Sequence, residues 1–346
     1  MSDTDEILFE RRGAVGLVTL NRPKALNALT HGMVVALHAR LKQWAADDAV
    51  GTVVIQGAGD RAFCAGGDIR TLYDSGKAGT PYAIDFYRDE YRLNAFIKHF
   101  PKPYVALLNG FVMGGGVGVS LHGSHRVADE TMIFAMPETG IGLFPDVGGS
   151  WFLPRMRGEL GMYVALTGTR LRASDALYAG IGTFFVPATR RAAMMAELCA
   201  GADIVEHILQ ESEADEPAAP LRDLQGRIDA IFSAHSVESI LERLERDGTD
   251  WAADTARAIR AKSPTATKLA FRQIREGAKL SFDDCMRMEF RLVNRVIAGH
   301  DFYEGVRATI IDKDGAPKWQ PATLAQVRDA DIDAYFAPLG ESELTL

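Results

Sequence analysis

Short aliphatic runs alternate with longer amphipathic segments through the first half of the chain. The aliphatic runs have the length of buried strands, and the segments between them carry apolar residues at helical spacing. The expected strands are 7–11, 14–20, 52–56, 104–108, 125–128 and 131–135, and the expected helices are 30–46, 82–100 and one that begins near Gly114. Strands that alternate with helix-length connections indicate an α/β layer structure with crossover connections.

The second half of the chain predicts a different organisation. Strand patterns become sparse after Gly148, with 184–187 the clearest exception, and amphipathic patterns fill the sequence from Leu221 onward. The acidic, Pro- and Ala-rich stretch 211–220 is typical of a loop or linker. We therefore expect a core domain over residues 1–210 and a mainly helical region over residues 211–346.

Charge and cysteine content argue against several classes of protein. The 346 residues carry a net charge of −8 with no long basic run, which disfavours nucleic acid as a partner. No apolar run approaches the length of a membrane span, and the acidic N-terminus resembles neither a secretory signal nor a transit peptide. The three cysteines are far apart and odd in number, so we expect a reducing, cytoplasmic location. His122 and His125 have no third ligand nearby in the sequence, so no metal site is expected.

The stretch 113–154 concentrates the residues that can perform chemistry. A triglycine run, 114–116, opens an expected helix, and Glu138 and Asp146 follow in a Gly- and Pro-rich segment. Exposed N–H groups at a helix start can stabilise a negative oxygen, and a carboxylate beside them can act as base or nucleophile. A second glycine pair, Gly66 and Gly67, adds more exposed backbone. Either glycine run alone is more typical of a tight turn, but the combination predicts chemistry at a carbonyl group.

Four ordered blocks resemble the enoyl-CoA hydratase/isomerase, or crotonase, superfamily. They are LNRPKALNAL (20–29), GAGDRAFCAGGDI (57–69), NGFVMGGGVG (109–118) and MPETGIGLFPDVGG (136–149). The resemblance implies a twisted β-β-α spiral core with a helical C-terminal region. It also implies a coenzyme A thioester as substrate, and homo-oligomers built through the helical C-terminal parts.

Three further segments resemble one branch of this superfamily, the 3-hydroxyisobutyryl-CoA hydrolases. They are FYRDEYRLN (86–94), PETGIGLFPDVGGSWFLPR (137–155) and DFYEGVRATIIDKDGAPKW (301–319). With them the resemblance extends over nearly the whole chain. It implies hydrolysis of a short 3-hydroxyacyl-CoA, with 3-hydroxyisobutyryl-CoA of valine breakdown as the expected substrate, and it implies no metal or redox cofactor.

The resemblance also assigns roles to individual residues. The N–H groups of Gly67 and Gly115 would bind the thioester oxygen, and Glu138 would be the catalytic carboxylate. Asp146 would be the second acidic residue typical of the hydrolase branch, and Glu90 would contact the substrate. The residues expected to contact CoA are Lys24, Ala65, Asp68 and Ile69.

One position departs from the pattern of the hydratases. Hydratases place a glutamate two residues after the triglycine run and use it with a second glutamate to add water across a double bond. Here that position is Gly118, so of the pair only Glu138 remains. This favours a hydrolase over two other hypotheses, an enoyl-CoA hydratase or isomerase and a non-enzymatic acyl-CoA-binding protein.

Simpler explanations remain open for several of these residues. Glu138 and Asp146 each follow a proline and can cap the turn or helix that comes next. Glu90 lies in a polar stretch where a solvated or ion-paired helix face is typical. Cys64 lies close to the glycine pair, but no nearby His motif activates it, so a small buried residue is the simpler interpretation. The basic segment 262–277 can be a charged helix face or can help a neighbouring subunit hold CoA phosphates.

Overall fold

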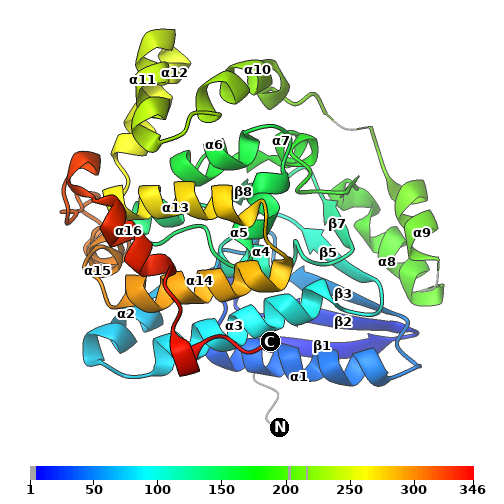
Figure 1. Ribbon diagram of the computed structural model, residues 1–346. Coiled ribbons are helices and arrows are strands. Elements are labelled where there is room, and N and C mark those ends of the chain that lie inside the picture. Colours follow the sequence, from blue (N-terminus) through cyan, green and yellow to red (C-terminus); the bar gives the residue numbers. More distant parts are fainter. Residues whose placement is uncertain (1–4, 202–203, 216) are drawn as a thin grey trace. The chain divides into compact units, whose positions relative to one another are not determined.

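The computed structural model describes residues 5–201, 204–215 and 217–346, and these form two compact units. The first unit comprises Met1–Asp68, Arg92–Phe134 and Leu171–Arg222, and the second comprises Ile69–Tyr91, Ala135–Arg170 and Asp223–Leu346 (Figure 1). Each unit is therefore assembled from three separate segments. This is a different division from the one expected at residue 210, which stays a prediction.

A six-stranded sheet forms the centre of the first unit. Its strand order is β1-β2-β3-β5-β7-β10, with β1 and β2 antiparallel and every later pair parallel. The strands are β1 (Ile7–Arg12), β2 (Val15–Leu20), β3 (Thr52–Gly57), β5 (Tyr104–Leu108), β7 (His125–Ala128) and β10 (Phe184–Phe185). Parallel neighbours joined by helical crossovers confirm the expected α/β class, and the first two expected strands pair as an antiparallel hairpin.

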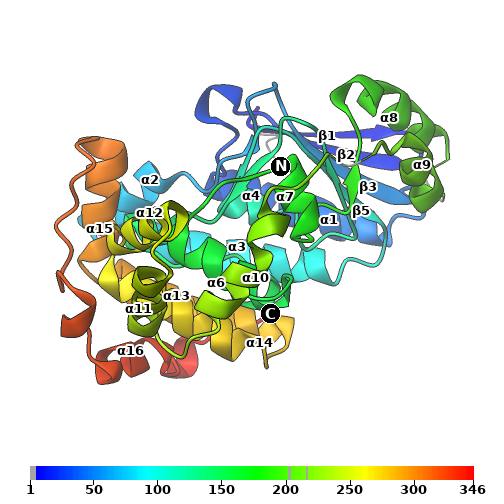
Figure 2. The same ribbon diagram turned by 90° about the horizontal axis from the view of Figure 1, so that it is seen from above.

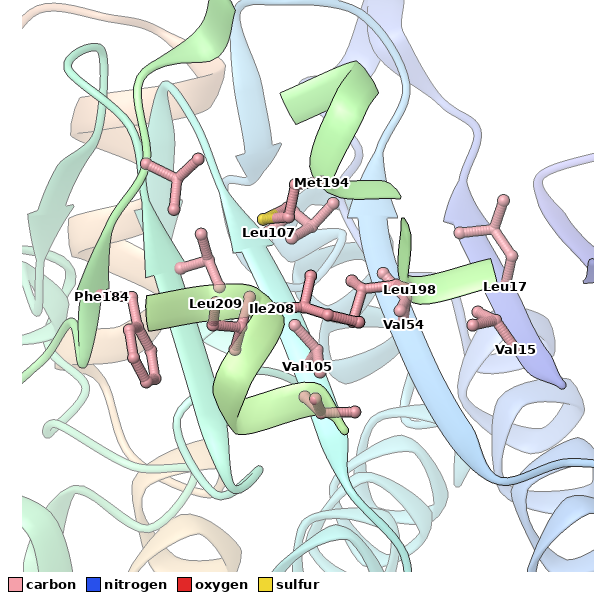
Figure 3. Close-up of a cluster of buried hydrophobic side chains, with 13 residues drawn as sticks. Val15, Leu17, Val54, Val105, Leu107, Phe184, Met194, Leu198, Ile208 and Leu209 are labelled. Carbon is pink, nitrogen blue, oxygen red and sulfur yellow. The ribbon is translucent and has the colours of Figure 1, made fainter. Parts of the chain in front are cut away.

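Helices cover both faces of this sheet. On one face, α8 (Arg191–Ala200) and α9 (Val205–Ser212) bury their apolar side chains against the strands (Figure 3). That core includes Val15, Leu17, Val54, Val105, Leu107, Met194, Leu198, Ile208 and Leu209. Because side chains alternate along a strand, Gly16 of β2 faces the other way, and there the Trp44 ring of α1 (His31–Ala46) packs on it.

The start of α1 follows from a local capping residue. The side chain of Thr30 accepts a hydrogen bond of 3.3 Å from the N–H of Met33, which satisfies one of the free amides of the first turn. The ring of His38 on α1 lies 5.2 Å from that of Phe96 near the end of α3 (Tyr82–Lys98). The expected helices 30–46 and 82–100 are therefore confirmed within two residues.

A second, four-stranded sheet has the order β4-β6-β8-β9. Its strands are β4 (Ala62–Cys64), β6 (Phe111–Met113), β8 (Ile133–Ala135) and β9 (Leu171–Arg172), and the short helix α4 (Gly115–Gly118) follows β6 directly. The remaining helical elements of the first unit are η1 (Pro23–Ala25), α7 (Ala173–Tyr178) and η4 (Ala188–Arg190). This sheet matters for function because β4 and β6 lead into the two glycine runs.

The second unit is built mainly of helices, as expected for the C-terminal half. In chain order they are α2 (Ile69–Ala78), η2 (Glu138–Ile141), α5 (Gly149–Phe152), η3 (Leu153–Arg155), α6 (Leu160–Thr167), α11 (Val237–Asp247), α12 (Asp250–Arg260), α13 (Pro264–Gly277), α14 (Phe282–Ile297), α15 (Asp301–Val306), a π-helical turn (Arg307–Ile311), η6 (Leu324–Gln326), α16 (Asp329–Phe336) and η7 (Gly340–Ser342). Helices α3 and α10 (Leu221–Phe232) run from one unit into the other.

Local capping explains where the long C-terminal helices begin. Helices α11 to α14 each start after a serine or threonine whose side chain accepts a hydrogen bond from an amide of the first turn; these residues are Ser236, Thr249, Ser263 and Ser281. Helices α11 and α12 lie side by side in both views (Figure 1, Figure 2).

In the described part of the chain, no helix is both long enough and apolar enough to cross a membrane.

Candidate active site

In the first unit, Gly67 forms a short parallel β-bridge with Leu29. Leu29 donates its N–H to the carbonyl of Gly66 at 2.8 Å and accepts the N–H of Asp68 at 2.9 Å. In a parallel bridge of this kind the flanking residues make the hydrogen bonds, so the N–H of Gly67 points away from Leu29. It is therefore available to another acceptor.

The second glycine run lies against the first. Gly115 is the first residue of α4, so its N–H has no partner inside the helix. A Cβ built on Gly66 would lie 3.8 Å from the nitrogen of Gly115, and Gly66 has a φ of 120° that favours glycine. A Cβ on Gly116 would lie 2.3 Å from the carbonyl oxygen of Cys64, so only glycine fits there. The first unit thus brings the two glycine runs together, and Cys64 is a buried packing residue.

Three of the four residues expected to contact CoA, Lys24, Ala65 and Asp68, lie in the first unit. Lys24 lies on η1 with its side chain exposed, and the N–H of Ala65 donates to the carbonyl of Leu26 at 3.0 Å. Asp68 accepts a hydrogen bond of 3.0 Å from Arg22. Ile69 belongs to the second unit as the first residue of α2. Their role in binding CoA stays a prediction.

Glu138 lies in the second unit at the start of η2, and α15 holds that turn closely. A Cβ on Gly142 would lie 2.2 Å from the carbonyl oxygen of Asp301, and a Cβ on Gly305 would lie 2.4 Å from the carbonyl carbon of Ile141. The segment DFYEG of the hydrolase branch therefore supports the element that carries Glu138. Glu138 is 5% exposed, and its Oε2 has no hydrogen-bond partner among the described residues.

Asp146 lies on the tight turn that leads into α5. Its Oδ2 accepts a hydrogen bond of 2.9 Å from the hydroxyl of Tyr91 on α3, and its backbone carbonyl accepts the N–H of Gly149 at 2.8 Å. The side chain of Asp146 is not the cap of α5. That role belongs to Glu289 of α14, whose carboxylate accepts the N–H groups of Gly148 and Ser150.

Glu90 faces the interior, one position before Tyr91 on α3. It is 2% exposed, and its Oε1 has no hydrogen-bond partner among the described residues, so a solvated helix face is excluded. Tyr87, one helical turn earlier, is also buried, and its ring centre lies 5.9 Å from that of Tyr91. The hydroxyl of Tyr87 likewise has no hydrogen-bond partner in the described part of the chain.

Burial raises the pKa values of all three carboxyl groups, and for Glu138 and Glu90 the charges of neighbouring carboxylates add to the shift. Burial raises the pKa of Asp146 to about 7, although the hydrogen bond from Tyr91 opposes the shift. Burial and the neighbouring Asp146 raise the pKa of Glu138 well above its usual range, while Lys262 opposes this. Burial and the charges of Asp146 and Glu289 raise the pKa of Glu90 in the same way. Two interacting buried carboxyl groups can hold one proton between them near neutral pH, which suits acid–base chemistry.

The second unit thus brings Glu138 and Glu90 close enough to Asp146 for their charges to interact, while the catalytic and binding roles of these residues stay predictions. Three residues of this cluster were missed: Tyr87, Tyr91 and Glu289. The two tyrosines share a helix face with Glu90, which is a pattern that helical spacing could have revealed. Glu289 gave no such indication, because it lies 139 positions after Ser150 in an ordinary amphipathic helix.

Comparison with known proteins places this geometry in a family. The family model described as enoyl-CoA hydratase/isomerase matches residues 15–336. The chain belongs to the enoyl-CoA hydratase/isomerase family. Among curated members, the 3-hydroxyisobutyryl-CoA hydrolase of Danio rerio is 48% identical over 350 aligned positions, which cover 99% of this chain and 92% of the relative. The Homo sapiens enzyme of the same name is 45% identical, with 98% of this chain and 90% of the relative covered.

Solved structures of the same family share the fold. A crystal structure of a carnitinyl-CoA dehydratase from Mycobacterium thermoresistibile is 43% identical, with a TM-score of 0.94 and 99% of both chains covered. An enoyl-CoA hydratase from Rhodobacter sphaeroides is 40% identical, with a TM-score of 0.93, and the match covers 99% of this chain and 100% of that one. The expected crotonase fold is confirmed.

The same comparisons overturn the expected location. The relatives from Danio rerio, Gallus gallus and Homo sapiens are all named mitochondrial enzymes. The prediction of a cytoplasmic protein is therefore wrong. It rested on cysteine content, which reports the redox state of a compartment rather than its identity.

Proposed function

We propose that this chain hydrolyses 3-hydroxyisobutyryl-CoA to 3-hydroxyisobutyrate and coenzyme A. The observation that carries the proposal is the buried pair of Glu138 and Asp146, whose pKa values are both raised. The names of the curated relatives support the same substrate. Valine breakdown is the metabolic setting that this substrate implies.

The proposed reaction begins with polarisation of the thioester carbonyl. The N–H groups of Gly67 and Gly115 bind its oxygen and stabilise the negative charge that forms there. Ionised Glu138 then either removes a proton from the attacking water or attacks the carbonyl carbon to give a mixed anhydride that water opens. In both routes the C–S bond breaks and the sulfur leaves as CoA thiol after protonation.

Asp146 and Glu90 are proposed to recognise the 3-hydroxyl of the acyl group. A carboxylate accepts a hydrogen bond from a hydroxyl, and a buried acceptor is left unsatisfied by a substrate that lacks the hydroxyl. Sites of this kind reject such analogues by up to roughly 10⁴–10⁵-fold. The pair would therefore give the enzyme its preference for hydroxylated acyl groups.

The rival hypothesis is hydration of an enoyl-CoA, and the names of two solved relatives support it. Syn addition of water to a double bond uses two positioned carboxylates. The position that hydratases use for one of them is Gly118, a buried glycine at the end of α4. The hydrolase is favoured for this reason.

Several further properties are proposed together with this activity. Lys24, Ala65, Asp68 and Ile69 would contact CoA, and the reaction would need no metal or redox cofactor. The chain would form homo-oligomers and would bind neither nucleic acid nor membranes.

A panel of acyl-CoA substrates tests the proposal directly. We expect thiol release from 3-hydroxyisobutyryl-CoA, slower release from isobutyryl-CoA, and little loss of the enoyl absorbance of crotonyl-CoA. Fast loss of that absorbance, without thiol release from the hydroxyacyl thioester, would assign the chain to the hydratases instead.

A further inference from the structure

The turn that carries Asp146 is strained at the residue that follows. Val147 has a φ of 49° and Gly148 a φ of 89°. Glycine adopts such angles freely, but a β-branched residue does so only where its surroundings hold it in place. Something outside the turn must therefore fix the backbone beside Asp146.

Glu289 of α14 holds the C-terminal side of this turn. Its Oε2 accepts the N–H of Gly148 at 2.8 Å, and its Oε1 accepts the N–H of Ser150 at 2.9 Å and also the hydroxyl of Ser150. Glu289 is 0% exposed. Burying a carboxylate is costly unless its hydrogen bonds are satisfied, and here both of its oxygens bond to the residues just after Asp146.

Gln273 of α13 holds the N-terminal side of the same turn. Its Nε2 donates a hydrogen bond of 2.5 Å to the carbonyl of Pro145, the residue just before Asp146, and its side chain is also fully buried. Two buried polar side chains from two different helices therefore bond to backbone on both sides of one carboxylate. All of these residues belong to the second unit.

Charged and titratable groups surround this turn on several elements. Glu90 and Tyr91 face Asp146 and Glu289 from α3, and Cys285 lies beside Glu289 on α14. Burial raises the pKa of Glu289 to about 8. The hydrogen bonds from Ser150 and Gly148 oppose this shift, and the negative charge of Asp146 adds to it. Glu289 lies close enough to influence Asp146 but bonds to its backbone neighbours rather than to the carboxylate itself.

We propose that Glu289 and Gln273 are positioning residues that act through Asp146 and thereby set the preference for hydroxylated acyl groups. The inference rests on the proposed function, because it assigns the selectivity of that same site to two helices of the C-terminal region. Orientation of a bound group controls rate steeply, so a small shift of Asp146 is enough to weaken recognition of the 3-hydroxyl.

The first test is Glu289→Gln, measured on 3-hydroxyisobutyryl-CoA and isobutyryl-CoA. Glutamine keeps the shape, but its NH₂ group opposes one of the backbone N–H donors. We expect kcat on the hydroxylated substrate to fall about 10-fold or more, with KM little changed, whereas kcat on isobutyryl-CoA falls less than about 3-fold. A role confined to folding would lower both rates equally and leave their ratio unchanged, and that result would overturn the proposal.

The second test asks whether Glu289 acts through Asp146. In an Asp146→Ala background, Glu289→Gln should leave the ratio of the two rates unchanged, because the group that it positions is gone. An equal fall in the ratio with and without Asp146 would contradict the proposal. Asp284→Asn is the matched control, since it removes an exposed carboxylate from the same helix and should leave the ratio at the wild-type value.

Two measurements keep the proposal testable in every case. Gln273→Met removes the hydrogen bond to the carbonyl of Pro145 and leaves Glu289 in place. If Glu289→Gln does not fold, Gln273→Met takes its place in the test. A ratio of the rates on 3-hydroxyisobutyryl-CoA and isobutyryl-CoA that equals the wild-type ratio would then refute the proposal. Hydrogen exchange of the peptide that covers residues 146–151 should speed up in either variant, and this readout needs no activity. If the wild-type protein releases no thiol from either substrate, the proposed function fails. Hydrogen exchange of the 146–151 peptide that is the same in the variants as in the wild type would refute the positioning role separately.

Discussion

The hydroxyl of Tyr91 donates a hydrogen bond of 2.9 Å to Oδ2 of Asp146, and both residues are buried. A hydrogen bond to the ionised carboxylate favours the charged form, so Tyr91 counteracts the burial that raises the pKa of Asp146 to about 7. Asp146 therefore ionises near neutral pH, where its carboxylate can accept a hydrogen bond from the hydroxyl of a ligand.

Tyr91→Phe should move the acid limb of the pH–rate profile upward. Loss of a hydrogen bond to a charged group is worth about 1.5–3 kcal/mol, and about 1.4 kcal/mol corresponds to one pH unit. Without this bond, Asp146 ionises less readily, so we expect the midpoint of log kcat/KM against pH to rise by about one pH unit or more. A midpoint that stays in place or falls would show that Asp146 does not control that limb.

Asp146→Asn should stabilise the protein at high pH while reducing activity. Folding raises the pKa of Asp146 from 3.8 to about 7, so between these values the folded state binds a proton that the unfolded chain has released. Its contribution to stability is therefore complete below about pH 4 and is lost as the pH rises through 7. Asparagine cannot ionise and escapes this loss.

The apparent melting temperature measured from pH 4 to pH 9 checks this prediction. We expect the variant to melt above wild type at pH 8–9 and level with it near pH 4. Asp284→Asn provides a control of opposite sign, because a hydrogen bond from Ser281 lowers the pKa of Asp284. A gap between Asp146→Asn and wild type that widens toward low pH would contradict the expected direction.

Gly116→Ala should destabilise the protein through a backbone clash. Its Cβ would lie 2.3 Å from the carbonyl oxygen of Cys64, and crowding of a packed core costs about 1–3 kcal/mol. Gly226→Ala is the matched control, because that glycine lies in α10 with no atom within 4 Å of the added Cβ. There alanine should stabilise by about 0.5–1 kcal/mol. Denaturant unfolding that gave both variants the same sign would disprove the proposed clash.

Most long elements could be predicted because their causes are local. The cap at Thr30 and the apolar spacing of 30–46 give the bounds of α1 within one residue, and the range 264–277 of α13 follows from a serine cap and a proline in the first turn. The strands β4, β6 and β9 were missed because each has only two or three residues and exists through its partners. A short segment contains too little pattern to reveal a strand.

The same difference between local and tertiary causes explains which residues of the candidate site could be predicted from the sequence. Glu138, Asp146 and Glu90 could be proposed from the sequence because the motifs around them are contiguous. Glu289 and Gln273 were not, since their importance arises only from the backbone groups that they contact across the fold. The capping hypothesis for Asp146 failed for this reason: the cap of α5 is supplied by α14.

Glu138→Gln should abolish most of the thioester hydrolysis without loss of CoA binding. Glutamine preserves size and hydrogen bonding but can neither accept the proton of water nor attack a carbonyl, and loss of a positioned acid–base group typically costs at least about 10²-fold. Glu138 is buried and its pKa is raised, so its carboxylate is a stronger base than one in water. The same change should therefore leave the dissociation constant for CoA within about 3-fold of wild type, because uniform binding is not affected.

Thiol release at saturating 3-hydroxyisobutyryl-CoA, together with calorimetric binding of CoA, separates these two effects. Glu276→Gln serves as the control, since it removes a partly exposed carboxylate from α13 and should retain wild-type turnover. If Glu138→Gln also kept wild-type turnover, Glu138 would have no part in the chemistry, and the raised pKa would reflect burial alone. If turnover and CoA affinity fell together, Glu138 would act in substrate binding and the catalytic carboxylate would have to be sought at Asp146.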